Sequence, residues 1–407
     1  MEPETNRLDH VRLLLGIFVW GGFALQLRWF ARCALGAGLV VAGYAVGSRF
    51  LTTEAAVATV GDQGARPQRA APRSSYRVIG VGDMMLGSDW PIPIMDDRVT
   101  PAGDASAVVG REIAALFRAG DVVFGNMEGT IHTSSENAKA CGNPRVCFTF
   151  RSPPFHAGYL RRAGFTLISN ANNHSRDFGE TGRAATYRNL IAAGLVVSGG
   201  DSAETRIGVQ TLADGTRFAL VAFGHNPGIM QVTDLARLAA IVQEAGRRAD
   251  VVVVSCHIGA EGSSRSQLTR ANELFLGENR GNPYAFGHAA VDAGADIVFC
   301  HGPHVPRAIE VYRGRFIAYS LGNFWTYGRF NLSGVSGLAP IADLQVGRDG
   351  ALVSARIVSA IQTRPGGPAL DPTGGAARRI AELTRQDLPG AGVTIADDGT
   401  VSWPRTR

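Results

Sequence analysis

Stretches typical of buried strands alternate with stretches typical of amphipathic helices along most of the chain, and this alternation most constrains the fold. YRVIGVG at 76–82 predicts a strand, ASAVVGREIAALFRAG at 105–120 a helix, and DVVFGN at 121–126 a second strand. The pattern continues to DVVVVSCH at 250–257 and ADIVFCHG at 295–302. A repeated strand–helix order predicts an α/β fold with a largely parallel sheet covered by helices.

After residue 305 the strand–helix alternation gives way to consecutive short strand-like runs, a pattern typical of antiparallel pairs. A Pro- and Gly-rich stretch at 363–376 ends the compact part, and a short helix near 376–386 is expected to pack back onto it. The expected domain organisation has four parts. These are a membrane region at 1–50, a flexible linker at 51–75, the α/β domain at 76–365 and a C-terminal extension at 366–407.

Composition places the chain among folded proteins. Its 407 residues suffice for a sizeable core, and 45% are hydrophobic while 18% are charged. The net charge of +5 does not indicate a nucleic-acid partner, because no arginine-rich stripe interleaved with aromatic residues occurs. Lys139 is the one lysine of the chain, so the positive charge is nearly all arginine.

Two uncharged runs near the N-terminus, at 13–27 and 33–48, each fall short of the roughly 20 residues of a comfortable membrane span. A helical hairpin, a single signal-anchor, a long signal peptide and a buried soluble helix are the alternatives. We favour a single span through 33–48, because Arg28 and Arg32 precede it and would stay inside. That arrangement predicts a cell-membrane protein whose main domain lies outside the cytoplasm.

Five cysteines occur without any CxxC pair, which argues against a structural zinc knuckle. Cys141 and Cys147 bracket the short loop CGNPRVC, and outside the cytosol they would be able to form a disulfide. Two unpaired thiols are the alternative. Cys33 lies in an apolar run, and Cys256 and Cys300 each end a predicted strand.

Polar side chains of ligand type follow five of the predicted strands. They are Asp83, Asn126 and Glu128, Asn172 to His174, His257 and Glu261, and His301 with His304. Because the carboxyl ends of parallel strands meet at one edge of a sheet, these residues are expected to lie close together. Carboxylates, an amide oxygen and neutral imidazoles suit Zn, Mn or Fe, so the sequence predicts a divalent-metal site with one or two ions.

Each of these residues also has a simpler interpretation when it is taken alone. Asp83 and the two asparagines at 172 and 173 are typical turn or helix-cap residues, Glu128 could be a solvated acid, and His257 a core histidine. The HGPH sequence at 301–304 is harder to explain by packing, and the convergence of all five loops favours a site. The remaining histidines are interpreted as ordinary residues: His10, His132, His156, His225 and His288.

Five motifs in this order resemble the CapA, or poly-γ-glutamate capsule synthesis, family of the calcineurin-like metallophosphatase superfamily. They are VGDMMLGSDW, GNMEGTI, ANNHSRDFGETG, HIGAEG and HGPHVPRAIEVYRGRFIAYSLGNF, and the resemblance covers about residues 76–360. It implies a metallophosphatase-like α-β-β-α sandwich of four layers. It also implies a protein that makes or exports poly-γ-glutamate at the bacterial surface, in contact with the membrane and other capsule-synthesis subunits.

The resemblance assigns roles to the strand-end residues. Asp83 would hold one metal, Glu128 would bridge both, Asn173 and His257 would hold the second, and the histidines of HGPH would be divided between them. His174 would protonate the leaving group. The further residues assigned to the site are Asn126, Asn172, Asp177, Glu261 and Asn323.

The chain departs from the superfamily pattern at three places. Met85 stands where dinuclear phosphatases usually have a histidine, Glu128 replaces the usual aspartate, and HGPH has two residues between its histidines instead of one. His304 is therefore a safer ligand than His301, and a single-metal site is an alternative. The expected activity is metal-dependent phosphoester hydrolysis. The alternatives are a non-catalytic scaffold that binds the anionic polymer and a phosphoesterase of unrelated substrate.

Overall fold

The computed structural model describes residues 71, 73–143, 147–328, 330–364 and 366–405. The predicted N-terminal membrane region and nearly all of the linker at 51–75 lie outside these residues. Within the described part of the chain, no helix combines the length and the apolar character that crossing a membrane requires.

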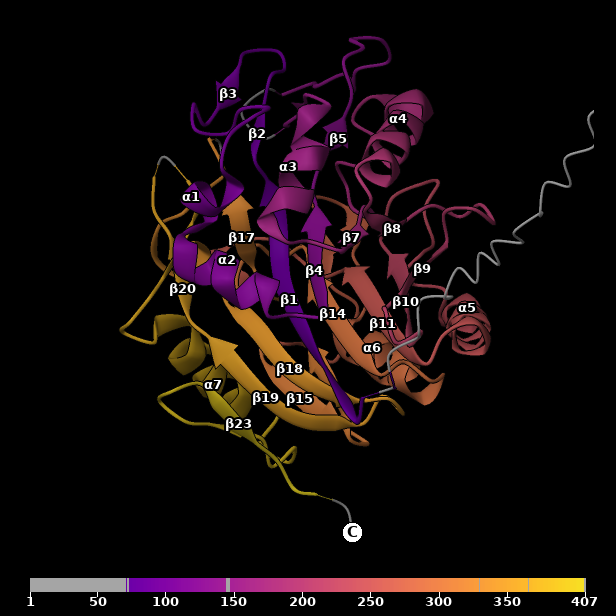
Figure 1. The fold of residues 1–407 in the computed structure, drawn as a ribbon, viewed down its shortest axis with the longest axis vertical. Coiled ribbons are helices and arrows are strands. Elements are labelled where there is room, and N and C mark those ends of the chain that lie inside the picture. The colour runs from indigo at the N-terminus through magenta and orange to yellow at the C-terminus, as the bar shows by residue number, and fades with distance from the viewer. Residues whose placement is uncertain (1–70, 72, 144–146, 329, 365, 406–407) are drawn as a thin grey trace, which may run out of the picture. The chain divides into compact units, whose positions relative to one another are not determined.

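Two sheets form the centre of the fold (Figure 1). The first has the order β22 (Thr394–Ile395), β23 (Thr400–Ser402), β19 (Leu352–Val358), β18 (Ile341–Gly347), β1 (Ser75–Met85), β4 (Val122–Met127), β7 (Leu167–Ser169) and β8 (Val196–Ser198), and β17 (Asn323–Thr326) also pairs with β1. The second has the order β15 (Ile309–Tyr312), β16 (Arg315–Ala318), β14 (Ile297–His301), β11 (Val251–His257), β10 (Arg217–Phe223) and β9 (Ile207–Thr211).

Seven helices of the described chain accompany these sheets. They are α1 (Ala105–Val109), α2 (Arg111–Arg118), α3 (Phe155–Ala163), α4 (Gly179–Ala192), α5 (Leu235–Arg248), α6 (Pro283–Asp292) and α7 (Gly375–Asp387). Short paired strands and 3-10 turns complete the fold: β2 (Gly87–Ser88), β3 (Ile94–Met95), β5 (Thr130–Ile131), β6 (Arg151–Ser152), β12 (Leu274–Phe275), β13 (Glu278–Asn279), β20 (Ala360–Gln362), β21 (Pro368–Leu370), η1 (Ser263–Arg265) and η2 (Gly334–Gly337).

The central strands β4, β11 and β14 are buried on both faces, which explains their nearly continuous apolar sequences. Val251 and Val253 of β11 belong to the core between the two sheets, whereas Val252 and Val254 face the core beneath α5 and α6. Helices α1 to α4 cover the outer face of the first sheet. The arrangement is thus helix, sheet, sheet, helix, in agreement with the four layers that the family resemblance implies.

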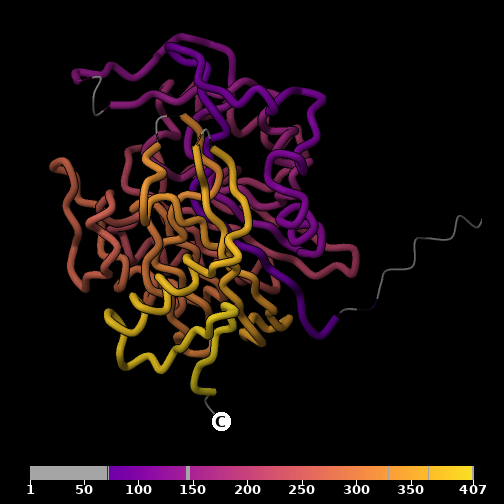
Figure 2. Tube along the Cα trace, turned by 90° about the vertical axis from the view of Figure 1, so that its left-hand side faces the viewer, coloured from indigo at the N-terminus to yellow at the C-terminus, as the bar shows by residue number. Residues whose placement is uncertain are grey.

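The antiparallel part predicted after residue 305 is present, since β15 pairs with β16 and β18 with β19 in that sense. The C-terminal extension predicted at 366–407 packs onto this body. Its strand β23 pairs antiparallel with β19, and α7 occupies the region where a helix was expected. Figure 2 shows this segment, in yellow, beside the orange strands.

Candidate metal centre

The end of β1 places Asp83 at the middle of the first sheet, next to strands β4 and β17. Its backbone N–H donates to the carbonyl of Gly322 at 2.9 Å. A Cβ on Gly82 would lie 1.9 Å from that carbonyl oxygen, so glycine is required for β17 to approach this closely. Glu128, directly after β4, is fixed by a backbone hydrogen bond from its N–H to the carbonyl of Met84 at 2.9 Å.

A turn after β7 carries Asn172, Asn173 and His174. The Asn172 amide donates to the carbonyl of Met127 at 2.8 Å and to Asn126 Oδ1 at 3.1 Å, while its own Oδ1 accepts the N–H of His174. Asn126 in turn donates to Asp83 Oδ1 at 2.8 Å. Asn172 is therefore a turn-forming residue that also helps to orient Asp83.

Two histidines of the second sheet end adjacent parallel strands, and they are direct register partners. The Nδ1 atoms of His257 and His301 lie 2.9 Å apart, and His301 Nδ1 is 3.4 Å from Asp83 Oδ1. The other ring nitrogen of His301, Nε2, lies 2.8 Å from the hydroxyl of Ser255. The strand ends of the two sheets therefore meet at this point, where Asp83 of the first sheet lies beside His257 and His301 of the second.

His304 connects the two acidic groups of the centre. Its Nδ1 lies 3.0 Å from Asp83 Oδ2 and 3.0 Å from Asn323 Oδ1, and its Nε2 lies 3.5 Å from Glu128 Oε1. The backbone of His304 has a positive φ of 59°, and Gly302 has a φ of 113°. This left-handed turn directs His304 back toward the first sheet.

The atoms that the predicted ligands offer fit a metal. Ligand atoms of Asp83, His257 and His301 lie within 4.8 Å of one another, as do those of Asp83, Glu128 and His304. Glu128 Oε2 and His257 Nε2 are buried and accept no hydrogen bond from any residue that the structure describes. Such atoms are costly to bury unless something binds them, and a divalent cation would satisfy them.

Asn173 Oδ1 is also buried and without a hydrogen-bond partner among the described residues. This separates the two neighbouring asparagines: the side chain of Asn172 is used within the fold, whereas the oxygen of Asn173 remains available. The ligand role of Asn173 stays a prediction.

Burial and neighbouring charges set the protonation of the centre. Burial lowers the pKa of His301 to about 4 and that of His257 well below its usual range, so both imidazoles are neutral near pH 7. Burial raises the pKa of Glu128 well above its usual range. Burial opposes the charged form of His304, but the charges of Glu128 and Asp83 raise its pKa to about 10. Neutral imidazole is the form that binds metals, so His257 and His301 are ready to bind one, whereas His304 would have to release a proton.

The predicted proton donor His174 lies beside the centre and is 8% exposed. Its Nδ1 lies 2.7 Å from Asp177 Oδ2, and the remaining ring nitrogen is free of this contact. A pocket of about 360 Å³ opens over the site, and His174 and His304 both belong to its lining. A substrate in this pocket would reach the candidate ligands and the candidate acid together.

The other predicted site residues take supporting positions. Asn323 contacts His304, as described above. Glu261 lines the pocket but is 2.7 Å from Arg280 Nη1, so its charge is already paired. Met85 is buried and its sulfur accepts the N–H of Gly87 at 3.2 Å, so it offers nothing to a metal. The missing histidine noted in the sequence is therefore not replaced at that position.

Two features escaped the sequence interpretation. Ser255 positions His301, and its place two residues before His257 puts it on the same strand face, which is the signal that could have revealed it. His225 was interpreted as ordinary, yet its Nδ1 lies 3.4 Å from the carbonyl of His257. Neither residue follows from strand-end placement alone, because each is connected to the centre only by a contact with a neighbouring histidine.

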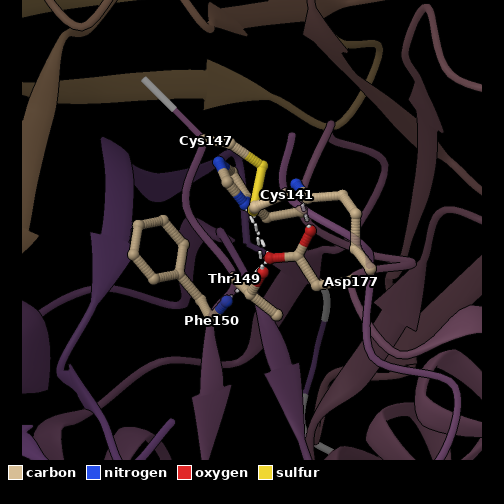
Figure 3. The surroundings of a disulfide bond; sticks show 7 residues. Cys141, Cys147, Thr149, Phe150 and Asp177 are labelled. Carbon is tan, nitrogen blue, oxygen red and sulfur yellow. Dashed lines mark hydrogen bonds and ion pairs between the residues drawn. A yellow bond between two sulfur atoms is a disulfide. The ribbon is translucent and has the colours of Figure 1, made fainter. Parts of the chain in front are cut away.

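The cysteines form two bridges. Cys141 and Cys147 are joined, which is one of the two alternatives that the sequence left open (Figure 3). Cys256 and Cys300 are also joined, directly before His257 and His301 on the adjacent strands β11 and β14. The sequence placed these two cysteines only at strand ends, because pairing of β11 with β14 is a property of the tertiary structure.

Fold and site together define an α/β sandwich protein with a candidate divalent-metal centre at its strand ends. The chain belongs to the family described as bacterial capsule synthesis protein PGA_cap, whose sequence model matches residues 77–327. The family resemblance of the motifs is thereby confirmed.

Curated relatives and a solved structure are similar to this chain over part of their length. The PGA biosynthesis protein CapA of Bacillus subtilis (strain 168) is 30% identical over 269 residues, which cover 61% of this chain and 64% of the relative. The capsule biosynthesis protein CapA of Bacillus anthracis is 27% identical over 260 residues, covering 60% of this chain and 58% of the relative. The chain thus spans less than two thirds of either relative.

The NAD nucleotidase of Haemophilus influenzae has a TM-score of 0.36 and 9% identity, with 76% of this chain and 55% of that chain covered. A likeness of this size carries no conclusion about this chain.

Proposed function

We propose that this chain is a membrane-anchored, metal-dependent phosphoester hydrolase that serves poly-γ-glutamate capsule synthesis or export. The observation that carries the proposal is that unpartnered ligand atoms and a His–Asp pair occur together at the strand ends, where His174 and His304 line one pocket. Glu128 Oε2, Asn173 Oδ1 and His257 Nε2 supply the ligand atoms, and His174 with Asp177 supplies the pair. The capsule assignment rests on the family and on the names of the relatives.

The residues that would hold the metal or metals are Asp83, Glu128, Asn173, His257, His301 and His304. A bound divalent cation supplies charge stabilisation for a phosphoryl group and a lower pKa for a water molecule. His174 would donate a proton to the leaving oxygen, and Asp177 would hold the imidazole in the orientation and tautomer that this requires. Asn126 and Asn172 keep the carboxylate of Asp83 aligned.

A non-catalytic scaffold that binds the anionic polymer is the second candidate, and one observation favours it. Both ring nitrogens of His301 already have close protein neighbours, at Ser255 and at His257. Met85 offers no ligand on the same side. One of two metal positions would then have few protein ligands and would bind its ion weakly. Two-metal hydrolysis needs both ions in place to stabilise the phosphoryl group.

Metal content and turnover of the full chain test the proposal. We expect elemental analysis after mild purification to find at least one bound Mn, Zn or Fe per chain. We expect hydrolysis of phosphomonoester or phosphodiester probes that stops with chelator and returns with metal. Bound metal without turnover on either probe would favour the scaffold, and no bound metal, with a melting temperature that chelator leaves unchanged, would overturn both functions.

The proposed location is the cell membrane, with a single span near residues 33–48 and the metal domain outside the cytoplasm. Arg28 and Arg32 before that run support this orientation. The Cys141–Cys147 bridge also supports it, because disulfides persist in oxidising compartments. Other capsule-synthesis subunits are the proposed partners there.

A further inference from the structure

Aromatic rings dominate the walls of the pocket over the metal centre. Phe148, Phe150, Phe275 and Phe330 all belong to the lining, together with His174 and His304. They come from three separate segments of the chain, so the rings are brought together only by the fold. Ligand pockets of this size commonly combine apolar walls with a few polar groups at one end.

The rings form a continuous wall between the proton donor and the metal ligands. Phe150 lies 4.4 Å from the ring of His174, measured between centroids, and is stacked with Phe330 at 5.5 Å. Phe330 meets His304 edge-on at 5.4 Å, and Phe148 stacks parallel to Phe150 at 6.2 Å. A flat group that enters beside His174 would therefore meet aromatic faces and edges along its path.

The hairpin of β12 and β13 contributes a further ring to the lining. Phe275 lines the pocket there, and the guanidinium of Arg280 lies 5.2 Å from its ring centre. Leu274 and Leu276 on either side of it are 66% and 74% exposed, although neither belongs to the lining. The hairpin therefore adds one ring to the lining and presents two further apolar side chains to solvent.

Away from the metal centre, the lining offers no cation to a polyanion. Apart from the imidazoles of His174 and His304, the lining residues that the structure describes include one acid, Glu261, and no lysine or arginine. Glu261 is paired with Arg280, whose side chain is 4% exposed and so is directed away from solvent. A polymer of carboxylates would gain little from such walls, whereas an uncharged ring would gain contact area.

We infer that this pocket is a subsite for a planar apolar group attached to the phosphate that the metal centre binds. The inference rests on the proposed function and narrows its substrate class to phosphoesters whose leaving group carries an aromatic ring. The phosphate would lie at the metal ligands, the ester oxygen would face His174, and the ring would lie between Phe150, Phe330 and Phe275. Poly-γ-glutamate itself would not occupy this subsite.

The test compares two non-hydrolysable probes, methylphosphonate and phenylphosphonate, by calorimetric titration of the full chain loaded with Mn²⁺. Both present the same anionic head, so their difference reports the ring alone. Aromatic contacts predict that phenylphosphonate binds on the order of tenfold more tightly. Phe275→Ala and Phe330→Ala should each reduce this ratio severalfold while methylphosphonate affinity and metal content stay at the wild-type level.

Phe155→Ala is the matched control, because Phe155 is a half-buried ring that packs against the helices on the outer side of the first sheet and does not line the pocket. It should leave the ratio unchanged. Phe275 contacts none of the candidate ligands through its ring, so this variant remains informative if Phe330→Ala disturbs His304.

Equal affinity for the two probes, or an unchanged ratio in both variants, would overturn the subsite and leave the metal centre intact. A γ-linked glutamate oligomer that binds more tightly than phenylphosphonate, and displaces it, would overturn the subsite in favour of polymer binding. Failure of the Mn²⁺-loaded chain to bind either phosphonate would overturn the proposed function, and the subsite with it.

Discussion

His174 Nδ1 lies 2.7 Å from Asp177 Oδ2, three residues along the same turn. Asp177 is fully buried and receives two more contacts: the N–H of Phe150 donates to Oδ2 at 2.7 Å, and Lys139 Nζ lies 2.7 Å from Oδ1. Figure 3 shows Asp177 between Phe150 and the segment closed by Cys141 and Cys147. The candidate acid His174, the backbone of Phe150 and the one lysine of the chain therefore meet at one carboxylate.

His174→Ala is expected to separate proton donation from metal binding. Metal content should stay near the wild-type level, because the ring contacts Asp177 and none of the six metal-ligand candidates. Turnover on the phosphoester probe should fall by a factor on the order of 10²–10⁴, as the loss of a general acid does. Steady-state kinetics and elemental analysis of the same preparation measure both quantities.

Asn173→Ala provides the contrasting variant, because it removes a ligand oxygen and not a proton source. It should lower metal content as well as turnover. If both residues only shaped the turn, each change would cost about 1 kcal/mol of stability and leave metal and rate alone. If His174→Ala matches wild type in every assay that Asn173→Ala fails, the hydrolase claim is wrong and the metal claim stands. In cells, the scaffold alternative predicts capsule output that survives His174→Ala and not His257→Ala.

Glu128→Gln is expected to reduce metal content without weakening the metal-free fold. Burial already disfavours the charged form of Glu128, as its raised pKa indicates, and the neutral amide avoids that cost. Functional residues of this kind are often held at the expense of stability. In the presence of chelator, the midpoint of urea unfolding of the variant should equal or exceed that of wild type. A clearly lower midpoint would mean that Glu128 is mainly a structural ion-pair partner of His304.

Breaking the Cys141–Cys147 bridge should cost about 2 kcal/mol of unfolding free energy, the value expected for closing so short a loop. Cys141→Ser and the double variant with Cys147→Ser should lose the same amount, because the bond and not either side chain carries the effect. Turnover should also fall, since Lys139, two residues before Cys141, contacts Asp177, the partner of His174. Denaturant titration measures the first effect. Unequal losses in the single and double variants would contradict the assignment to the bond.

Asp296 should make the free energy of unfolding depend on pH. Burial raises its pKa to about 6 in the folded chain, whereas an unfolded aspartate titrates at about 3.9. Between about pH 4 and pH 6 the folded state binds more protons than the unfolded state, so stability falls as pH rises through that window, by up to about 3 kcal/mol. In Asp296→Asn the side chain is uncharged at every pH, so the variant does not lose stability as the pH rises through this window. Its stability relative to wild type should therefore increase from pH 4 to pH 7, and a constant difference would refute the prediction.

A C-terminal alkaline-phosphatase fusion tests the proposed orientation. Because alkaline phosphatase needs disulfides, the fusion should be active only if the metal domain lies outside the cytoplasm. A reporter that works in the cytosol, fused at the same place, should be silent. The reverse pattern would favour the N-terminal hairpin, which returns the domain to the cytoplasmic side.

Local sequence patterns were sufficient to place the candidate ligands at strand ends. Apolar runs such as VVVVSCH predict a strand from their own composition, and a polar residue after the run then lies at the edge of a sheet. Asp83, Glu128 and His257 follow this rule. The helix at Gly375–Asp387 was likewise expected from its own local sequence. The sequence left open whether Cys141 and Cys147 form a disulfide or remain two thiols, because spacing alone does not distinguish them.

Tertiary structure decided which of these residues face one another. The sequence by itself does not distinguish one open sheet from two packed sheets, because a strand buried on both faces has the same apolar sequence in both arrangements. Only the packing of the sheets brings His301 within 3.4 Å of Asp83. Only side-chain geometry separates Asn172, whose amide serves the fold, from Asn173, whose oxygen is left for a ligand. Likewise the Cys256–Cys300 bridge and the aromatic wall join segments distant in the chain, and long-range contacts of this kind leave no local periodicity to detect.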